Sequence, residues 1–327
     1  MSREMSRRRL LGLGTGVVAA AVLAPSVLGK KAAGAATLDP EPPCVPPAGL
    51  LPEERIGIQL YTVRDRISSL GFAKVFETLA ATGFKEVEFA GYTQGSVGPI
   101  TLEQIRQLLD DNGLVAVGSH ASVSTSNVQQ KLDEAQILGM PTIGNATTSS
   151  SAPTLAGWQA AADTYNQIGE ACAARGLKFY LHNHQTEFAP IADQPTTRVY
   201  DVLLDETDVD KVFFEMDIYW AYVGQYLFSR APFGTFEPMD YLTAQPQRFP
   251  LFHVKDGKSN VQNPQGYDMV DVGQGNIDFQ GFFEKLATAD LPNHSYLNER
   301  DNASAHPHGS LASGLASFWW MRRGLKP

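Results

Sequence analysis

Four short segments in the second half of the chain combine carboxylate, imidazole and amine side chains. They read His182-Asn183-His184-Gln185-Thr186-Glu187, Glu215-Met216-Asp217, His253-Val254-Lys255-Asp256 and Glu299-Arg300-Asp301. Because alternate side chains of a strand share a face, His182 is expected on the same side as His184, and His253 on the same side as Lys255. Buried charges of this kind are costly unless they are compensated, and a divalent cation would compensate them.

Each of these segments offers a ligand for one metal ion. The expected ligands are Glu187, Asp217, His253 and Glu299. Carboxylate and imidazole together suit Mn²⁺, Co²⁺, Zn²⁺ or Mg²⁺, and without cysteine ligands a structural zinc site is not expected. Taken singly, an Asp after a strand is more often a helix cap and a lone His more often a core residue. Their coincidence on consecutive strands favours a metal site.

The bulk composition narrows the class of protein. The chain has 327 residues, of which 43% are hydrophobic and 19% charged, with a net charge of −9. This composition is globular, and the length fits one large α/β domain or two ordinary ones. The negative charge, with no basic cluster beyond Lys31, argues against a nucleic-acid partner.

The first 36 residues are typical of an export signal. Arg7, Arg8 and Arg9 follow Ser6 and precede an apolar run, which is the pattern of a twin-arginine signal peptide. A retained membrane anchor is the alternative, although the apolar run is short and rich in Gly and Ala. We therefore expect a periplasmic or extracellular protein without stable membrane insertion after cleavage. Residues 37–54 are proline-rich and predict an extended linker, so the fold should begin near Arg55.

From Arg55 onward, strand-like runs alternate with helical patterns. The expected strands are Ile56–Tyr61, Glu86–Ala90, Val115–His120, Thr142–Asn145, Lys178–His184, Val212–Asp217, Leu251–Lys255 and Ser295–Glu299. The expected helices are Phe72–Thr82, Thr101–Asn112, Asn127–Leu138, Trp158–Arg175, Phe279–Ala289 and Leu311–Arg322. Eight strands with helices between them, in about 270 residues, predict a single-domain α/β fold, the (β/α)₈ TIM barrel. An open doubly wound sheet is the alternative, but Tyr61–Asp65 lacks its glycine-rich phosphate loop.

The chain from Arg55 to its end resembles the xylose isomerase-like TIM-barrel family, also called the sugar phosphate isomerase/epimerase family. The matching segments are Gly57–Asp65, Gly83–Glu88, His182–Phe188, Met216–Trp220, His253–Asp256, Val272–Asp278 and Glu299–Asp301. The resemblance implies a metal held by Glu, Asp, His and Glu of the late strands, which matches Asp217, His253 and Glu299. Many relatives have Glu where this chain has His182. Glu187 is therefore expected as the first ligand and His182 in substrate contact or proton transfer, and the reverse assignment remains open.

The resemblance further implies proton transfer next to a sugar carbonyl, with the metal as Lewis acid. The expected catalytic residues are Glu187, Glu299, His182, His184 and Lys255. The expected substrate contacts are Gln59, Arg64, Glu88, His120, Trp220 and Asp301. The stretch 222–249 is expected either as a lid or as a helix pair, and His306 and His308 lie in a polar loop near Asp301.

Three functions remain open at this point. The first is a metal-dependent isomerase or epimerase of a non-phosphorylated sugar or cyclitol, because an exported chain without a phosphate loop is unsuited to phosphorylated intermediates. The second is a lyase or hydrolase that cleaves 3-keto-glycosides by β-elimination. The third is a non-catalytic sugar-binding barrel. In each case the partner is a small carbohydrate, and the chain could form a homo-oligomer.

Overall fold

The computed structural model describes residues 49–229, 234–287 and 294–325. The expected export signal and most of the expected linker lie outside these ranges. The packed part of the chain begins before Arg55, because Leu51 is buried and Glu53 forms an ion pair with Arg322 at 2.7 Å. Within the described ranges, no helix combines the length and apolarity needed to cross a membrane.

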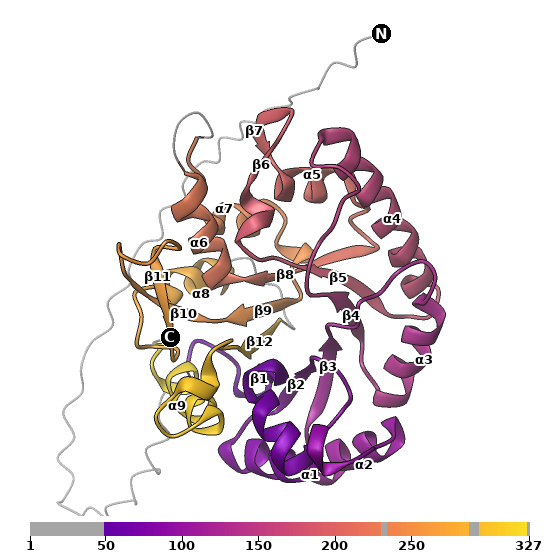
Figure 1. Cartoon of the computed structure of the whole chain (residues 1–327), viewed down its shortest axis with the longest axis vertical. Helices are drawn as coiled ribbons and strands as arrows, with labels where there is room; N and C mark the ends of the chain where they lie inside the picture. The colour runs from indigo at the N-terminus through magenta and orange to yellow at the C-terminus, as the bar shows by residue number, and fades with distance from the viewer. Residues whose placement is uncertain (1–48, 230–233, 288–293, 326–327) are drawn as a thin grey trace, which may run out of the picture. The chain divides into compact units, whose positions relative to one another are not determined.

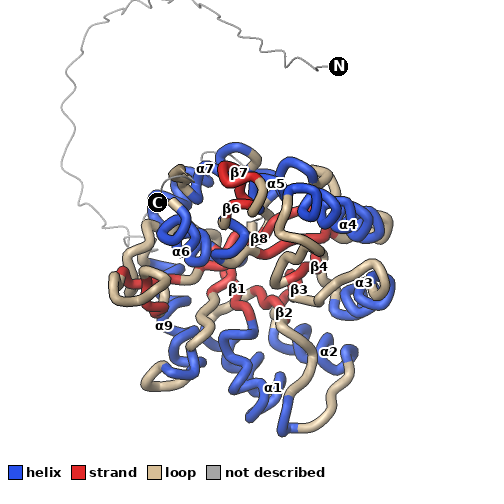
Figure 2. The backbone as a smooth tube through the Cα atoms, turned by 45° about the horizontal axis from the view of Figure 1, so that its top comes forward, coloured by secondary structure: helices blue, strands red, loops and turns tan. Residues whose placement is uncertain are grey.

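A ring of eight parallel strands forms the centre of the molecule (Figure 2). The strands are β1 (Ile56–Gln59), β2 (Glu86–Phe89), β3 (Val115–Ser119), β4 (Thr142–Asn145), β5 (Lys178–His182), β8 (Val212–Asp217), β9 (Leu251–Val254) and β12 (Ser295–Asn298). Their order in the sheet is β3-β2-β1-β12-β9-β8-β5-β4, and a parallel bridge between His120 and Gly144 joins the two ends. The expected (β/α)₈ barrel is confirmed.

Helices connect successive strands and surround the ring (Figure 1). They are α1 (Arg64–Thr82), α2 (Leu102–Asn112), α3 (Val128–Leu138), α4 (Leu155–Ala173), α5 (Val199–Glu206), α6 (Ile218–Phe228), α7 (Pro238–Ala244), α8 (Phe279–Ala287) and α9 (Ser310–Arg323). Apolar side chains of the helices and of the outer strand faces form the main core. Thr101 caps α2 in a capping box with Gln104, as the sequence indicates.

Several element boundaries differ from the sequence expectations. Helix α1 begins at Arg64 rather than Phe72, and it continues through a kink at Gly71, whose φ of 80° is readily adopted only by glycine. Helix α5 was not expected. Six of the strands end one or two residues early because the chain turns after the last paired residue; after β1 and β5 it enters short 3₁₀ helices, η2 (Leu60–Val63) and η4 (Gln185–Phe188).

Two hairpins interrupt the strand–helix alternation. One is β6 (Pro190–Ile191) with β7 (Gln194–Arg198), between β5 and α5. The other is β10 (Asp256–Ser259) with β11 (Tyr267–Val270), directly after β9. Because both follow the C-terminal end of a barrel strand, they belong to the end of the barrel where catalytic loops lie.

The described part of stretch 222–249 forms the end of α6 and all of α7. Phe236 stacks on Phe188 with ring centroids 5.1 Å apart, and Tyr241 packs edge-on against Tyr200 at 5.0 Å. This aromatic cluster holds α7 against the body of the barrel, as expected of the helix-pair alternative. Phe233, an aromatic residue of the possible lid, lies outside the described residues.

Candidate active site

His253 is the side chain around which the polar groups of the barrel mouth are arranged. It comes from β9 and is fully buried. Its Nδ1 faces Glu299 Oε2 at 2.9 Å, His182 Nε2 at 3.2 Å and Asp217 Oδ2 at 3.8 Å. His182 and Asp217 end β5 and β8, and Glu299 directly follows β12, so parallel strands of the same sheet bring them to the same depth.

The opposite nitrogen of the same ring faces a second pair of carboxylates. His253 Nε2 lies 2.7 Å from Glu88 Oε2 and 3.1 Å from Glu215 Oε1. Burial lowers the pKa of His253, but the carboxylates of Glu215, Glu299 and Glu88 together raise it well above its usual value. The His253 imidazole therefore links two sets of residues. We call His182, Asp217, His253 and Glu299 the outer group, and the carboxylates of Glu88 and Glu215 belong to the inner layer.

Lys255 supplies the positive charge of the outer group. Its Nζ lies 2.6 Å from Glu299 Oε2, 2.8 Å from Asp217 Oδ2 and 3.0 Å from Asp301 Oδ1. The lysine is 1% exposed. Burial lowers its pKa, but these carboxylates raise it well above the usual value, so Lys255 is an ammonium counter-ion.

Asp217 has two separate tasks. Its Oδ1 accepts a hydrogen bond from the Trp220 amide at 2.9 Å and so caps helix α6. Its Oδ2 is buried, forms ion pairs and accepts no directed hydrogen bond from the described residues. Oδ1 therefore matches the interpretation of Asp217 as a helix cap, and Oδ2 matches its interpretation as a metal ligand.

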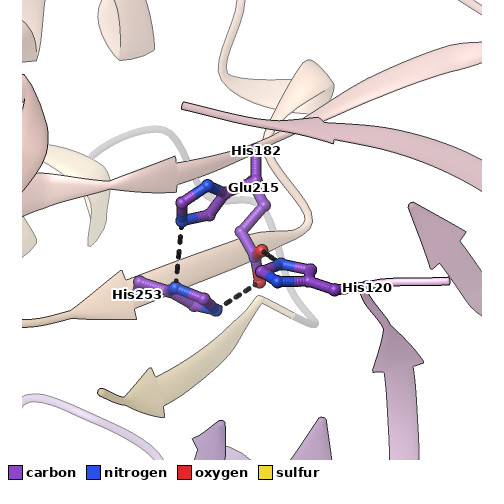
Figure 3. Close-up of side chains that lie close together, drawn as sticks. All are labelled: His120, His182, Glu215 and His253. Atoms are coloured by element: carbon purple, nitrogen blue, oxygen red, sulfur yellow. Dashed lines mark hydrogen bonds and ion pairs between the residues drawn. The ribbon is translucent and has the colours of Figure 1, made fainter. Parts of the chain in front are cut away.

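Four buried side chains could hold a metal ion. The ligand atoms of His182, Asp217, His253 and Glu299 all lie within 4.8 Å of one another. The Asp217 Oδ2, which accepts no directed hydrogen bond from the described residues, and the mixed imidazole and carboxylate donors fit a borderline or hard divalent ion. A second set, His120, His182, Glu215 and His253, meets the same distance limit (Figure 3).

Glu187, the expected first ligand, lies in neither set. The chain leaves β5 at His182 and turns into η4, and there Glu187 faces its own turn. Glu187 Oε2 accepts from the His184 amide at 2.9 Å, and Oε1 accepts from the Thr148 hydroxyl at 2.7 Å. The structure thus brings His182, rather than Glu187, next to Asp217, His253 and Glu299.

His182 is held in one tautomer by the backbone. Its Nδ1 lies 3.1 Å from the Ala146 carbonyl oxygen, which can only accept, so Nδ1 carries the proton and Nε2 faces the other ligands. Burial lowers the pKa of His182 to about 4. The imidazole is therefore neutral at pH 7, which is the form that binds metals or accepts protons.

The inner layer is a closed network beneath His253. Glu88 accepts from Gln59 Nε2 at 2.7 Å and from the Tyr180 hydroxyl, while Glu215 Oε2 lies 2.8 Å from His120 Nε2. Burial raises the pKa of Glu88. Burial also raises the pKa of Glu215, but His253 and His120 lower it more, so that its pKa falls below the usual value.

Sequence reasoning gave no role to Glu215, although it named the segment that contains it, and it did not single out Tyr180. A signal for Glu215 was present, because it lies two residues before Asp217 on a strand and so shares its inward face. Tyr180 has the same relation to His182. Gln59 and Glu88, expected as substrate contacts, are fully buried in this inner layer.

A cavity of about 330 Å³ opens over the outer group. It is lined by Tyr61, Ala90, His120, Ala146, His182, His184, Glu299 and Asp301. Five of the expected catalytic or substrate residues are among them. Lys255 and Trp220 are not; the Trp220 ring lies beside His184, with centroids 5.6 Å apart.

Arg64, which was expected to contact substrate, and the histidine pair His306 and His308 are not part of this cavity's lining. Arg64 lines a neighbouring cavity. His306 faces Asp271, with Nε2 3.3 Å from the carboxylate, and His308 is exposed beside it. The polar loop that carries these histidines therefore does not reach the cavity above His253.

Solved structures share this fold. A sugar phosphate isomerase/epimerase from Parabacteroides distasonis superposes with a TM-score of 0.66 at 21% identity, covering 83% of this chain and 94% of its own. A probable 3-DHS dehydratase involved in petrobactin synthesis, from Bacillus anthracis, has a TM-score of 0.60 at 14% identity, covering 82% and 98%. An L-ribulose 3-epimerase has a TM-score of 0.57 at 14% identity, covering 82% and 93%. At these identities the likeness establishes the fold alone.

Sequence comparison identifies the family. No curated protein sequence is significantly similar to this chain. The family model described as xylose isomerase-like TIM barrel matches residues 76–323, which include all the barrel strands except β1 and all four residues of the outer ligand group. This chain belongs to the xylose isomerase-like TIM-barrel family.

Proposed function

We propose that this chain is a divalent-metal-dependent sugar isomerase or epimerase that transfers a proton next to a carbonyl group. The observation that carries the proposal is the convergence of His182, Asp217, His253 and Glu299 within 4.8 Å, beneath a cavity of about 330 Å³. The names of the fold relatives, among them L-ribulose 3-epimerase, support the same reaction class.

A metal bound by these four residues would supply Lewis-acid polarisation of the sugar carbonyl. The protein's part is to orient the donors. Glu88 and Glu215 face His253 Nε2, which directs Nδ1 toward the site, and the Ala146 carbonyl does the same for His182. Such outer contacts fix the tautomer and the orientation of ligating histidines.

Proton transfer needs groups that line the cavity and are not among the four donors. His184 and Asp301 meet both conditions. Burial raises the pKa of Asp301, although Lys255 opposes this, and a raised pKa brings a carboxyl closer to the range in which it exchanges protons. We assign His184 and Asp301 to proton transfer, and His120 to contact with the sugar.

The substrate is proposed to be a non-phosphorylated sugar or cyclitol. Among the described residues that line the first cavity there is no Lys or Arg, and these are the side chains that bind phosphate most strongly. The twin-arginine-type signal of residues 1–36 supports a periplasmic or extracellular site of action, where phosphorylated sugars are scarce.

Elimination from a keto-glycoside is the second candidate reaction. The observation that favours it is the presence of three imidazoles, from His120, His182 and His184, in the cavity wall. An epimerase of the two-carboxylate kind would place a second Glu there, and Glu187 instead caps its own turn. A neutral imidazole is a competent base for abstracting a proton next to a ketone.

The test combines metal analysis with isotope exchange. The purified protein is expected to bind about one Mn²⁺, Co²⁺ or Zn²⁺ per chain, and an Asp217→Ala, His253→Ala double variant is expected to bind none. The matched control is Asp133→Ala on the exposed surface. With metal, the protein should exchange the α-proton of a keto-sugar for deuterium. Release of a second product would identify elimination.

Two results would contradict the proposal. If wild-type protein and double variant both fail to take up metal, the Lewis-acid role is wrong. If Glu299→Gln keeps sugar affinity and no proton exchange occurs in the wild type, the chain is a sugar-binding protein rather than an enzyme.

A further inference from the structure

A second cavity lies beside the first and shares two of its wall residues. Its volume is about 240 Å³, and Tyr61 and Ala90 line both cavities. Both residues follow barrel strands, Tyr61 after β1 and Ala90 after β2, so the second cavity lies at the same end of the barrel. A ligand bound above His253 can therefore extend past Tyr61 into the second cavity.

Tyr61 forms the boundary between the two cavities. It is 42% exposed, which is high for a large aromatic side chain at a cavity wall. The Arg64 guanidinium lies 3.7 Å from the ring centroid, and Arg64 lines the second cavity only. The guanidinium thus stacks on the Tyr61 ring, while 42% of the tyrosine stays exposed and the residue borders both cavities.

Arg64 is fixed in this position by the backbone. It donates to the Tyr61 carbonyl at 2.6 Å and to the Asp301 carbonyl at 2.8 Å. The Asp301 side chain lines the first cavity. The boundary between the cavities is therefore a braced structure that joins the loops after β1 and β12.

The two cavities differ in chemistry. The first has three imidazoles and two carboxylates in its wall. The second includes the apolar residues Leu60, Ile67 and Phe72. Ser68 and Thr93 are its hydroxyl-bearing residues besides Tyr61, and Arg64 is the charged residue among its described lining. The first wall suits a polyhydroxylated ring and the second suits a group with little hydrogen-bonding capacity.

We propose that the two cavities bind one glycoside, with the sugar ring in the first cavity and an apolar aglycone in the second. The substrate class is then an aryl or alkyl glycoside whose sugar ring carries the keto group next to which the proposed proton transfer occurs. Tyr61 is a platform on which the linkage between the two parts rests, since the C–H face of a sugar packs on an aromatic ring. This inference rests on the proposed sugar chemistry of the first cavity.

The experiment measures binding of matched probe pairs to the full chain by calorimetry. The probes are glucose, galactose and xylose, each compared with its phenyl β-glycoside. At least one phenyl glycoside is expected to bind at least about 10-fold more tightly than its free sugar, which is the effect of burying an apolar group of that size.

A blocking variant separates the two cavities. Ser68 is exposed at the rim of the second cavity, so Ser68→Trp should fill that cavity without disturbing the core. The variant is expected to abolish the phenyl advantage and to leave free-sugar affinity unchanged. Ser69→Trp, the adjacent exposed position outside the cavity lining, is the matched control and should retain the advantage.

Three results would overturn the inference. Equal binding of free sugar and phenyl glycoside, unaffected by Ser68→Trp, would remove the aglycone site and leave the proposed function standing. Tighter binding of glucose 6-phosphate than of phenyl glucoside, lost in Arg64→Met, would make the second cavity a phosphate site. Failure of every free sugar and every glycoside to bind would overturn both the inference and the proposed function.

Discussion

The two ends of the barrel both bury charged side chains, but they balance the charges differently. At the end where strands begin, Arg55 pairs with Glu86 at 2.7 Å. At the same end Arg248 donates to the Val212 carbonyl at 2.9 Å and to the Thr207 hydroxyl at 2.7 Å. Each of these two arginines therefore has a separate set of partners.

At the mouth, where strands end, the balance is negative. Asp217, Glu299 and Asp301 share the single ammonium of Lys255, and Glu88 and Glu215 share one imidazole nitrogen. A cluster with more carboxylates than cations is stabilised by binding a cation, whereas the opposite end is complete by itself. The comparison indicates that one end maintains the fold and the other is arranged for a ligand.

The largest effect on stability is expected at the end where the strands begin, which we call the self-contained end. Arg248→Met removes donors from Val212, Thr207 and Leu204 in a fully buried position. Leaving these acceptors without partners should reduce the free energy of unfolding by about 3–5 kcal/mol. Urea denaturation measures this, with the partly exposed Arg175→Met as control. Loss of metal binding by the folded variant would break the division between the two ends.

Asp217→Asn tests metal binding at the mouth of the barrel. Asparagine keeps an oxygen to cap α6 but removes a charge from the crowded cluster, so the affinity for Mn²⁺ should fall by more than about 100-fold. Stability without metal should fall, because the Lys255 ammonium 2.8 Å from Oδ2 holds the pKa of the buried Asp217 carboxyl well below its usual range, and asparagine removes this charge from the pair. Calorimetric titration and thermal melts measure both quantities. Normal affinity for Mn²⁺ in the folded variant would contradict the assignment.

Glu215→Gln tests whether a residue that only positions a donor also affects metal binding at the mouth. Glu215 acts through His253, so its loss should weaken metal binding by about 10- to 100-fold while the donors remain in place. Glu170→Gln on the surface of α4 is the control. A change in Mn²⁺ coordination detected by electron paramagnetic resonance would show a positioning effect, and unaltered affinity would place Glu215 outside the metal's influence.

The smallest effect concerns pH at the self-contained end. Burial lowers the pKa of His294, with Arg55 and Lys178 adding to the shift and a hydrogen bond to the Phe249 carbonyl opposing it. Because the folded state resists protonation, stability is full above about pH 6.5 and declines as pH falls below that value. His294→Gln should flatten the decline between pH 6.5 and 5, measured as the midpoint of thermal unfolding. An unchanged slope would show that other groups cause it.

The sequence predicted the barrel because short β-rich runs alternate with helical patterns, several of which end in their own stop signal, such as Gly113 after α2. The sequence also predicted that Asp217, His253 and Glu299 lie together, because they stand at the ends of strands that must be neighbours, and the structure brings them together. It did not predict that His182 rather than Glu187 lies beside them, because this depends on where β5 stops and how η4 turns. The inner layer depends on partners up to 165 residues apart, such as Glu88 and His253, and such pairings follow from the closure of the ring rather than from local pattern.

Asp217 gives the molecule an internal reporter of the state of its site. One oxygen of this carboxylate holds the Trp220 amide at the start of α6, and the other faces the candidate ligand group. Any ion that draws the carboxylate toward itself must alter the hydrogen bond at the helix end. Hydrogen exchange at the Trp220 amide, followed by nuclear magnetic resonance or mass spectrometry, should therefore change upon occupancy even before a substrate is known.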